Sequence, residues 1–315
     1  MKKNLSKYLK IAFSVVLLFY LFYYMIDLKS LVIELKRAKP AFVILAFIFL
    51  VLSVFASSYR WQYVINIKNT HISFKACVRE YFIGSFFNNF LPGSIGGDIM
   101  RMAGAYKETG SKEISFSSVI IERVVGLAAM LFVGLTGFII LNIGNSPSYI
   151  QISSIMLIML FLLLFIITNK KTNKILSEFT ETYIPEKISS VIISYLRDFA
   201  GYSSTLKIFI VFLLSLIFKI LDGFFVYFVF LSLGIELSYA HAIALFSIIN
   251  VIKMLPISFN GLGLSAISWV LLLRSFGISE SAAASVDFLV ISISLLMSTY
   301  GGLLYFVKTG KEKGL

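Results

Sequence analysis

The sequence FFNNFLPGSIGGDIMR at residues 86–101 interrupts one long apolar stretch, and MLPISFNGLG at residues 254–263 interrupts another. Proline removes a backbone N–H and glycine permits positive φ, so each stretch predicts a helix, a break and a second helix. Irregular backbone at membrane depth is tolerated only where protein buries it or where it lines a wet cavity. Two such breaks in corresponding halves of a chain are typical of the substrate site of a transporter with an inverted repeat.

Composition places the whole chain in a membrane. Of its 315 residues, 58% are hydrophobic and 14% are charged, whereas about a quarter of the residues of a soluble domain are charged. About 20 mostly apolar residues span a bilayer, and six segments qualify: 9–26, 41–59, 116–141, 150–168, 207–233 and 282–307. We expect an all-α polytopic membrane protein with about six full transmembrane helices and two re-entrant hairpins. They would form a single domain whose halves are 1–115 and 116–315.

The distribution of lysine and arginine predicts the topology, because cytoplasmic loops carry an excess of both. Both termini and the 168–207 connection are rich in lysine, whereas 142–150 has no charge. We therefore expect a multi-pass protein of the cell membrane with both termini in the cytoplasm. The first broken segment would enter from the cytoplasm and the second from outside. The basic residues of 27–40 oppose this assignment, because that loop should be external.

Composition also argues against several function classes. The net charge of +12 is explained by the positive-inside rule, so we expect no nucleic-acid partner. Cys77 is the single cysteine, and His71 and His241 lie far apart, so we expect neither an intrachain disulfide nor a metal site. With no P-loop and no supported Ser-His-Asp set, we expect no cofactor and no enzyme activity. A homo-oligomer is compatible with the sequence.

The first break carries the residue types of an anion site. Exposed N–H groups at a helix start bind anions, Asp98 is well placed to cap that helix, and Arg101 could grip a phosphate bidentately. Glycines would allow a turn with positive φ. The alternative is a plain turn in which Asp98 and Arg101 pair at i,i+3. The substrate-binding candidates here are Asn88, Asn89, Gly93, Gly96, Gly97, Asp98 and Arg101.

The second break resembles the first in kind. Lys253 precedes it and would place a second cation opposite the first, which suits a substrate with a charged headgroup. The alternative is that Lys253 extends to an interface. The candidates for substrate contact are Lys253, Ser258, Asn260 and Gly261.

Charged residues inside apolar helices are rare and face a partner or water. Glu122 and Arg123 cannot face each other because they are adjacent on a helix, so Arg101 could pair with Glu122 and Asp98 with Arg123. These two residues would couple or stiffen the site. For Lys219 and Asp222, spaced i,i+3, we favour structural pairing.

Four residues or segments near the expected span ends are assigned to the interface. Arg60 and Glu80 are expected to be solvated there, and Trp61 to belong to an aromatic belt. The amphipathic stretch 186–200 is expected to lie along the cytoplasmic interface.

Several motifs resemble the lysylphosphatidylglycerol synthase transmembrane region family. They are Arg60-Trp61, the run from Gly84 to Asp98 with Arg101, Glu122-Arg123 with Gly126, and Pro256-Ile257-Ser258 with Gly261-Leu262-Gly263. The specific core of the run is Asn-x-x-x-Pro-Gly-x-x-Gly-Gly-Asp-x-x-Arg, from Asn88 to Arg101. The resemblance covers nearly the whole chain. It implies a flippase-like membrane region, here expected without the soluble synthase domain. Ser265-Ala266 stand where the family usually has an Arg-Glu pair, so coupling is expected to be lost or to use another residue.

Together these features favour a flippase that moves an anionic phospholipid or a lipid-linked phosphate, such as a polyprenyl phosphate. One alternative is an integral-membrane transferase acting on a lipid headgroup, with Glu122 or Asp98 as its general base. The other is a non-transporting partner subunit of a glycolipid pathway.

Overall fold

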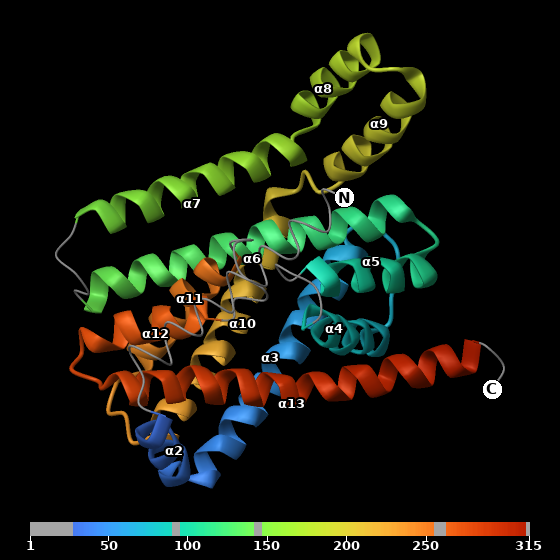
Figure 1. Ribbon diagram of the computed structural model, residues 1–315. Coiled ribbons are helices and arrows are strands. Elements are labelled where there is room, and N and C mark those ends of the chain that lie inside the picture. Colours follow the sequence, from blue (N-terminus) through green and yellow to red (C-terminus); the bar gives the residue numbers. More distant parts are fainter. Residues whose placement is uncertain (1–27, 90–94, 142–146, 255–262, 313–315) are drawn as a thin grey trace, which may run out of the picture.

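The computed structural model describes residues 28–89, 95–141, 147–254 and 263–312 (Figure 1). The span expected at 9–26 therefore lies outside the described residues. The described chain is helical and contains no strand, which confirms the all-α class. Its helices are α2 (Leu28–Arg37), α3 (Pro40–Asn66), α4 (Phe74–Asn88), α5 (Ile95–Thr109), α6 (Lys112–Leu141), α7 (Pro147–Thr168), α8 (Lys170–Tyr183), α9 (Glu186–Ala200), α10 (Thr205–Ser232), α11 (Tyr239–Met254), α12 (Leu264–Arg274) and α13 (Glu280–Glu312).

Local sequence signals explain where these helices begin. Pro40 opens α3, a position at which the missing N–H costs nothing. Ser73 caps α4 by accepting a hydrogen bond from the backbone N–H of Ala76 at 3.2 Å. Asn169 caps α8 in the same way. Gly263 precedes α12 with φ at 77°, a conformation that favours glycine.

Four described helices, α3, α6, α10 and α13, are long and apolar enough to cross a membrane. A shorter apolar stretch, Leu157–Ile166, lies within α7. Large apolar side chains remain exposed on these helices, including Ile140 at 76% and Leu296 at 63%. Such surfaces are unfavourable in water, so we assign them to the lipid.

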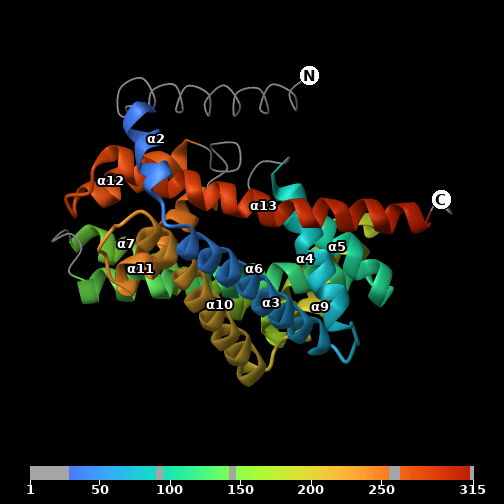
Figure 2. The same ribbon diagram turned by 90° about the horizontal axis from the view of Figure 1, so that it is seen from below.

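The bundle is held together by packing between helices that are distant in sequence. The most extensive contact joins α3 to α10, which run side by side obliquely through the molecule (Figure 2). In addition, α13 packs along α4, and α11 packs along α6. The largest buried cluster centres on α10, α11, α12 and α13, where Phe230 and Trp269 meet edge to face at 5.8 Å.

The two interrupted segments each form a pair of short helices. At 15 residues each, α4 and α5 are about 22 Å long, whereas the hydrocarbon core is about 30 Å thick. The helices α11 and α12 have 16 and 11 residues. The pairs lie toward opposite ends of the bundle (Figure 1). This arrangement agrees with hairpins that enter from opposite sides, and their re-entrance into a bilayer stays a prediction.

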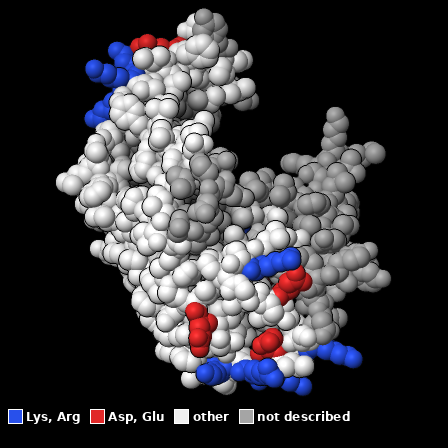
Figure 3. Space-filling model, turned by 90° about the vertical axis from the view of Figure 1, so that its left-hand side faces the viewer, with Lys and Arg blue, Asp and Glu red and all other residues white. Residues whose placement is uncertain are grey.

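One end of the bundle is largely uncharged (Figure 3). Figure 3 views the molecule from the end at which α7 begins, and most of the face drawn there is uncharged. Lysine, arginine and acidic side chains gather at its upper and lower margins, the lower one on the side of α2. At the other end, α9 is tied to the bundle by an ion pair of 2.9 Å between Lys68 Nζ and Asp198 Oδ1. The expected amphipathic stretch is thus a helix, packed against α6.

Candidate functional site

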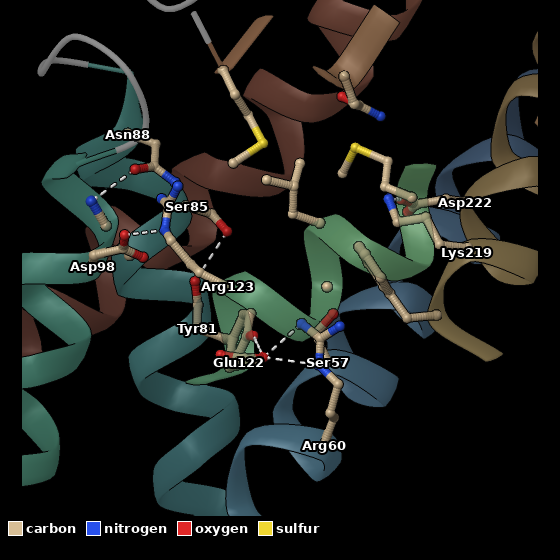
Figure 4. Close-up of a pocket in the computed structure, with 18 of the residues that line it drawn as sticks. Ser57, Arg60, Tyr81, Ser85, Asn88, Asp98, Glu122, Arg123, Lys219 and Asp222 are labelled. Atoms are coloured by element: carbon tan, nitrogen blue, oxygen red, sulfur yellow. Dashed lines mark hydrogen bonds and ion pairs between the residues drawn. The ribbon is translucent and has the colours of Figure 1, made fainter. Parts of the chain in front are cut away.

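A cavity of about 370 Å³ lies between α4 and α5 of the first interrupted segment and α11 of the second (Figure 4). It is lined from α3, α4, α5, α6, α10 and α11. The structure therefore brings together candidates that the sequence places in four separate segments. Those that line the cavity are Asn88, Gly97, Asp98, Arg101, Glu122, Arg123, Lys219, Asp222 and Lys253.

The remaining candidates are placed differently. Gly93, Ser258, Asn260 and Gly261 lie outside the described residues. Asn89 is not among the lining residues. Its side-chain Nδ2 donates a hydrogen bond of 2.8 Å to Ser298 Oγ and so joins α4 to α13.

Glu122 is the centre of a buried charge network. Its Oε1 accepts hydrogen bonds from Arg60 Nη2 at 2.7 Å, from Arg60 Nε at 3.1 Å and from the Tyr81 hydroxyl. Its Oε2 accepts one from Arg101 Nη1 at 2.6 Å. The side chain is 1% exposed, so the carboxylate is stabilised by these donors rather than by water.

Asp98 is the second carboxylate of the network. It accepts a hydrogen bond of 2.9 Å from Arg101 Nη2 and forms an ion pair with Arg123 Nε. The suggested pairs Arg101–Glu122 and Asp98–Arg123 are therefore confirmed. The pairing of Asp98 with Arg101 at i,i+3 is confirmed as well. Asp98 does not cap the helix, because α5 begins three residues earlier at Ile95.

Aromatic rings complete the surroundings of Arg101. Its guanidinium lies 4.4 Å from the centre of the Tyr81 ring and 5.2 Å from that of Trp61. Desolvated contacts of this kind are stabilising. The belt position expected for Trp61 is wrong, because the side chain is fully buried.

The solvated positions expected for Arg60 and Glu80 are also wrong. Both are buried, at 6% and 1% exposure. Arg60 joins the Glu122 network and donates to Ser215 Oγ at 3.0 Å. Glu80 accepts from Lys308 Nζ at 2.7 Å and so binds the end of α13 to α4. Both misassignments follow from treating a charge at a predicted span end as exposed.

Gly97 brings α4 and α5 into close contact. Its N–H donates a hydrogen bond of 2.7 Å to Asn88 Oδ1. A Cβ at this position would lie 2.6 Å from both Asn88 Oδ1 and Gly84 O. The turn expected at Gly96 and Gly97 is wrong, since both are helical and neither has positive φ. Glycine is required here for close approach rather than for a turn.

A stripe of small and polar residues on α4 faces the cavity, and the sequence identified only Asn88 among them as a site candidate. Its members are Tyr81, Gly84, Ser85 and Asn88. They are spaced i, i+3, i+4 and i+7, which puts them on one face of a helix. That spacing within an apolar segment is the signal that could have identified Tyr81.

The opposite wall carries fewer ion pairs. Lys219 Nζ and Asp222 Oδ2 are 2.7 Å apart and buried, which confirms that they pair. Lys253 lines the cavity from the last turn of α11. Among the residues that the structure describes, no salt bridge to Lys253 occurs.

The charged lining has an excess of positive charge. Five cationic side chains face three anionic ones, which leaves an excess of two. The cations are Arg60, Arg101, Arg123, Lys219 and Lys253, and the anions are Asp98, Glu122 and Asp222. Apolar side chains complete the lining, including Met130, Phe218 and Met254. Within the described chain, no group of three or more His, Cys, Asp or Glu could hold a metal ion.

The fold and cavity define a polytopic α-helical membrane protein with a charged internal site. The chain belongs to the family described as the lysylphosphatidylglycerol synthase TM region, whose model matches residues 8–302. It is 29% identical over 297 residues to the UPF0104 membrane protein MJ1595 of Methanocaldococcus jannaschii, covering 88% of this chain and 87% of the relative. It is 24% identical over 330 residues to the UPF0104 membrane protein PH1989 of Pyrococcus horikoshii, covering 98% of each.

Proposed function

We propose that this protein is a lipid transporter that moves an anionic phospholipid or a lipid-linked phosphate across the cell membrane. The observation that carries the proposal is the cavity lined by α4, α5 and α11 with three longer helices, which has an excess of two positive charges and an apolar lining beside them. A ligand with an anionic headgroup and apolar chains matches both features. The family description, which names a lipid synthase, supports a lipid substrate.

The geometry suggests which cations would contact the headgroup. Both terminal nitrogens of Arg101 already donate to carboxylates, and its side chain is 8% exposed. A phosphate would have to displace one of those carboxylates to reach it. Arg123 is more accessible, at 29%, and Lys253 lines the cavity without a salt bridge to any described residue. We therefore assign direct contact to Arg123 and Lys253, and assign to Arg101 the positioning of the network.

The alternative of a headgroup transferase fits the site less well. It would need a general base, and the candidates were Glu122 and Asp98. Glu122 accepts hydrogen bonds from two guanidinium groups and a phenol, and Asp98 is paired with two arginines. Carboxylate oxygens that already accept from these donors are poorly placed to take a proton from a substrate. We therefore propose that the protein is not an enzyme. From the lysine-rich terminal segments of the sequence, we also propose that both termini face the cytoplasm.

The test is lipid movement in vesicles. The purified full chain would be reconstituted in phosphatidylcholine vesicles with trace fluorescent phosphatidylglycerol, its lysyl form or a polyprenyl phosphate. Loss of fluorescence to a membrane-impermeant quencher reports movement between leaflets. We expect the protein to accelerate at least one anionic lipid and to leave labelled phosphatidylcholine unaffected.

Matched variants assign the effect to the cavity. Arg123→Gln removes a charge-assisted contact worth about 1.5–3 kcal/mol, so we expect movement at limiting lipid to fall about ten- to a hundred-fold. Arg274→Gln removes the same charge from an exposed position on α12, where the side chain is 69% exposed, and should match the wild type. Well-folded wild type that moves none of the lipids would refute the proposal. A chemically altered lipid recovered from the vesicles would favour the transferase.

A further inference from the structure

Lys253 differs from the other four cations of the cavity. Arg60 and Arg101 pair with Glu122, Arg123 pairs with Asp98, and Lys219 pairs with Asp222. Lys253 forms no salt bridge within the described part of the chain. One turn before it on α11, Ile249 packs in the same buried cluster as Val286 and Val290 of α13, which flank Asp287. The Lys253 ammonium is therefore attracted by the Asp287 carboxylate without direct contact between the two charged groups.

Asp287 is a buried carboxylate that the proposed substrate contacts do not use. It is 5% exposed, and its Oδ1 has no hydrogen-bond partner among the described residues. Ser265 of α12 lies beside it, is 1% exposed, and also has an Oγ without a partner in the described chain. Val286 and Val290 of α13, on either side of it in the sequence, are apolar and buried. A buried carboxylate with so few donors remains charged only while a cation balances it.

The charge of the Asp287 carboxylate is balanced by the Lys253 ammonium. Of the described residues, Lys253 is the charged group that acts on the Asp287 carboxyl, and Ser265 is the polar group. No charged side chain from the described parts of α2, α3, α4, α10 or α12, the helices that pack against α13, acts on it. The charge state of Asp287 therefore depends on where the Lys253 ammonium is.

We propose that Asp287 is a proton-binding residue linked through Lys253 to the occupancy of the cavity. When the cavity is empty, the Lys253 ammonium balances the Asp287 carboxylate. When a lipid phosphate enters, the ammonium turns to it, because lysine carries its charge on a flexible four-carbon stem. Asp287 then lacks a cation in an apolar site and takes up one proton from water. One negative charge and one proton enter the protein together, so its buried net charge is unchanged.

This inference rests on the proposed function and deepens it, because it makes lipid binding proton-linked. It also assigns the two segments around the second break different tasks. Lys253 on α11 contacts the substrate, whereas Asp287 on α13, beside Ser265 of α12, holds the proton.

Proton uptake on binding can be counted by titration calorimetry. The full chain in detergent would be titrated near neutral pH with dihexanoyl phosphatidylglycerol, whose phosphodiester stays singly charged. Repeating the titration in two buffers of different ionisation enthalpy gives the number of protons taken up. For the wild type we expect about one proton per lipid bound.

Three variants separate the roles. Asp287→Asn should still bind the lipid but take up no proton. Lys253→Met should bind about ten-fold more weakly and also take up none, because Asp287 would already be protonated before the lipid arrives. Glu280→Gln, a change near the exposed start of the same helix, should keep one proton.

The outcomes distinguish this inference from the proposed function. Wild type that binds the lipid without taking up a proton would refute the inference and leave the proposed function standing. Persistent uptake of one proton by the folded Asp287→Asn protein would also refute it. Wild type that binds none of the anionic lipids tested would overturn the proposed function, and this inference with it.

Discussion

The two walls of the cavity differ in how their charges are balanced. On the side of the first break, Glu122 and Asp98 share three arginines, and each carboxylate has at least two cationic partners. On the side of the second break, Lys253 and Asp287 attract each other without contact, and one oxygen of Asp287 has no partner in the described chain.

This difference indicates that buried charges can serve two purposes in one site, namely holding the helices together and binding a ligand. A fully satisfied network is rigid, because moving any member leaves another charge uncompensated. An incompletely satisfied pair has little to lose when a ligand offers a better partner. We therefore expect Glu122 on the first wall to respond to mutation mainly through stability, and Lys253 on the second wall to respond through binding.

The largest effect on stability is expected for Glu122→Gln. The substitution leaves Arg60 and Arg101 buried without their shared counter-charge, which costs about 3–5 kcal/mol. Thermal or denaturant unfolding of the protein in detergent measures this loss. The control is Glu178→Gln, which removes an exposed ion pair of 3.9 Å with Lys174 and should change stability by less than about 1 kcal/mol. Equal effects of the two substitutions would contradict the central role of Glu122.

A second test concerns the Lys219–Asp222 pair, which we interpret as structural. Lys219→Met alone leaves a buried carboxylate and should destabilise the protein by about 3 kcal/mol. The double variant Lys219→Met/Asp222→Leu removes both charges and should recover most of that loss. Unfolding measurements on the three proteins complete the comparison. If the double variant were stable yet unable to move lipid, the pair would belong to the transport machinery instead.

A smaller effect is expected from the contact between α4 and α5. In Gly97→Ala the new Cβ would lie 2.6 Å from Gly84 O and Asn88 Oδ1, so we expect a loss of about 1–3 kcal/mol. Gly134→Ala is the matched control, because its Cβ would be 3.5 Å from the nearest atom, a side-chain carbon of Ile248. There the better helix propensity of alanine should leave stability equal or raised. A tolerated Gly97→Ala would show that the two helices can separate at no cost.

The smallest effect on stability is expected for Lys253→Met. No salt bridge to a described residue is lost, and methionine fills much of the same space, so unfolding should shift by no more than about 1 kcal/mol. Lipid binding by the same protein should nonetheless weaken. A loss of stability comparable with that of Glu122→Gln would remove the contrast between the two walls.

Much of the site could be predicted from local patterns. Pro92 with its neighbouring glycines marked the first break, and an adjacent Glu122 and Arg123 in one apolar helix required separate partners. Since Asp98 and Arg101 were the charged candidates of the first break, the pairs that form could be named in advance. These inferences depend on helix geometry and on the cost of an unpaired charge, both of which can be evaluated along the chain.

Other members of the site could not be found in this way. Arg60 was expected to be exposed because it lies near the end of a predicted span, whereas the packing of α3 against α6 and α10 buries it beside Glu122 and Ser215. Nothing local in the sequence distinguishes Tyr81 from the many other aromatic residues. Only the fold places the polar stripe of α4 against the cavity. Asp287 lies far along the chain in a separate helix, and the sequence analysis did not identify it as a candidate.

The sequence by itself determined that this is an all-α membrane protein with two interrupted helices rich in glycine, because hydrophobicity and backbone freedom act over one or two helical turns. The tertiary structure alone decided which charges are satisfied. Balancing a buried charge requires a partner within a few ångströms, and in a helical bundle that partner comes from whichever distant helix packs alongside.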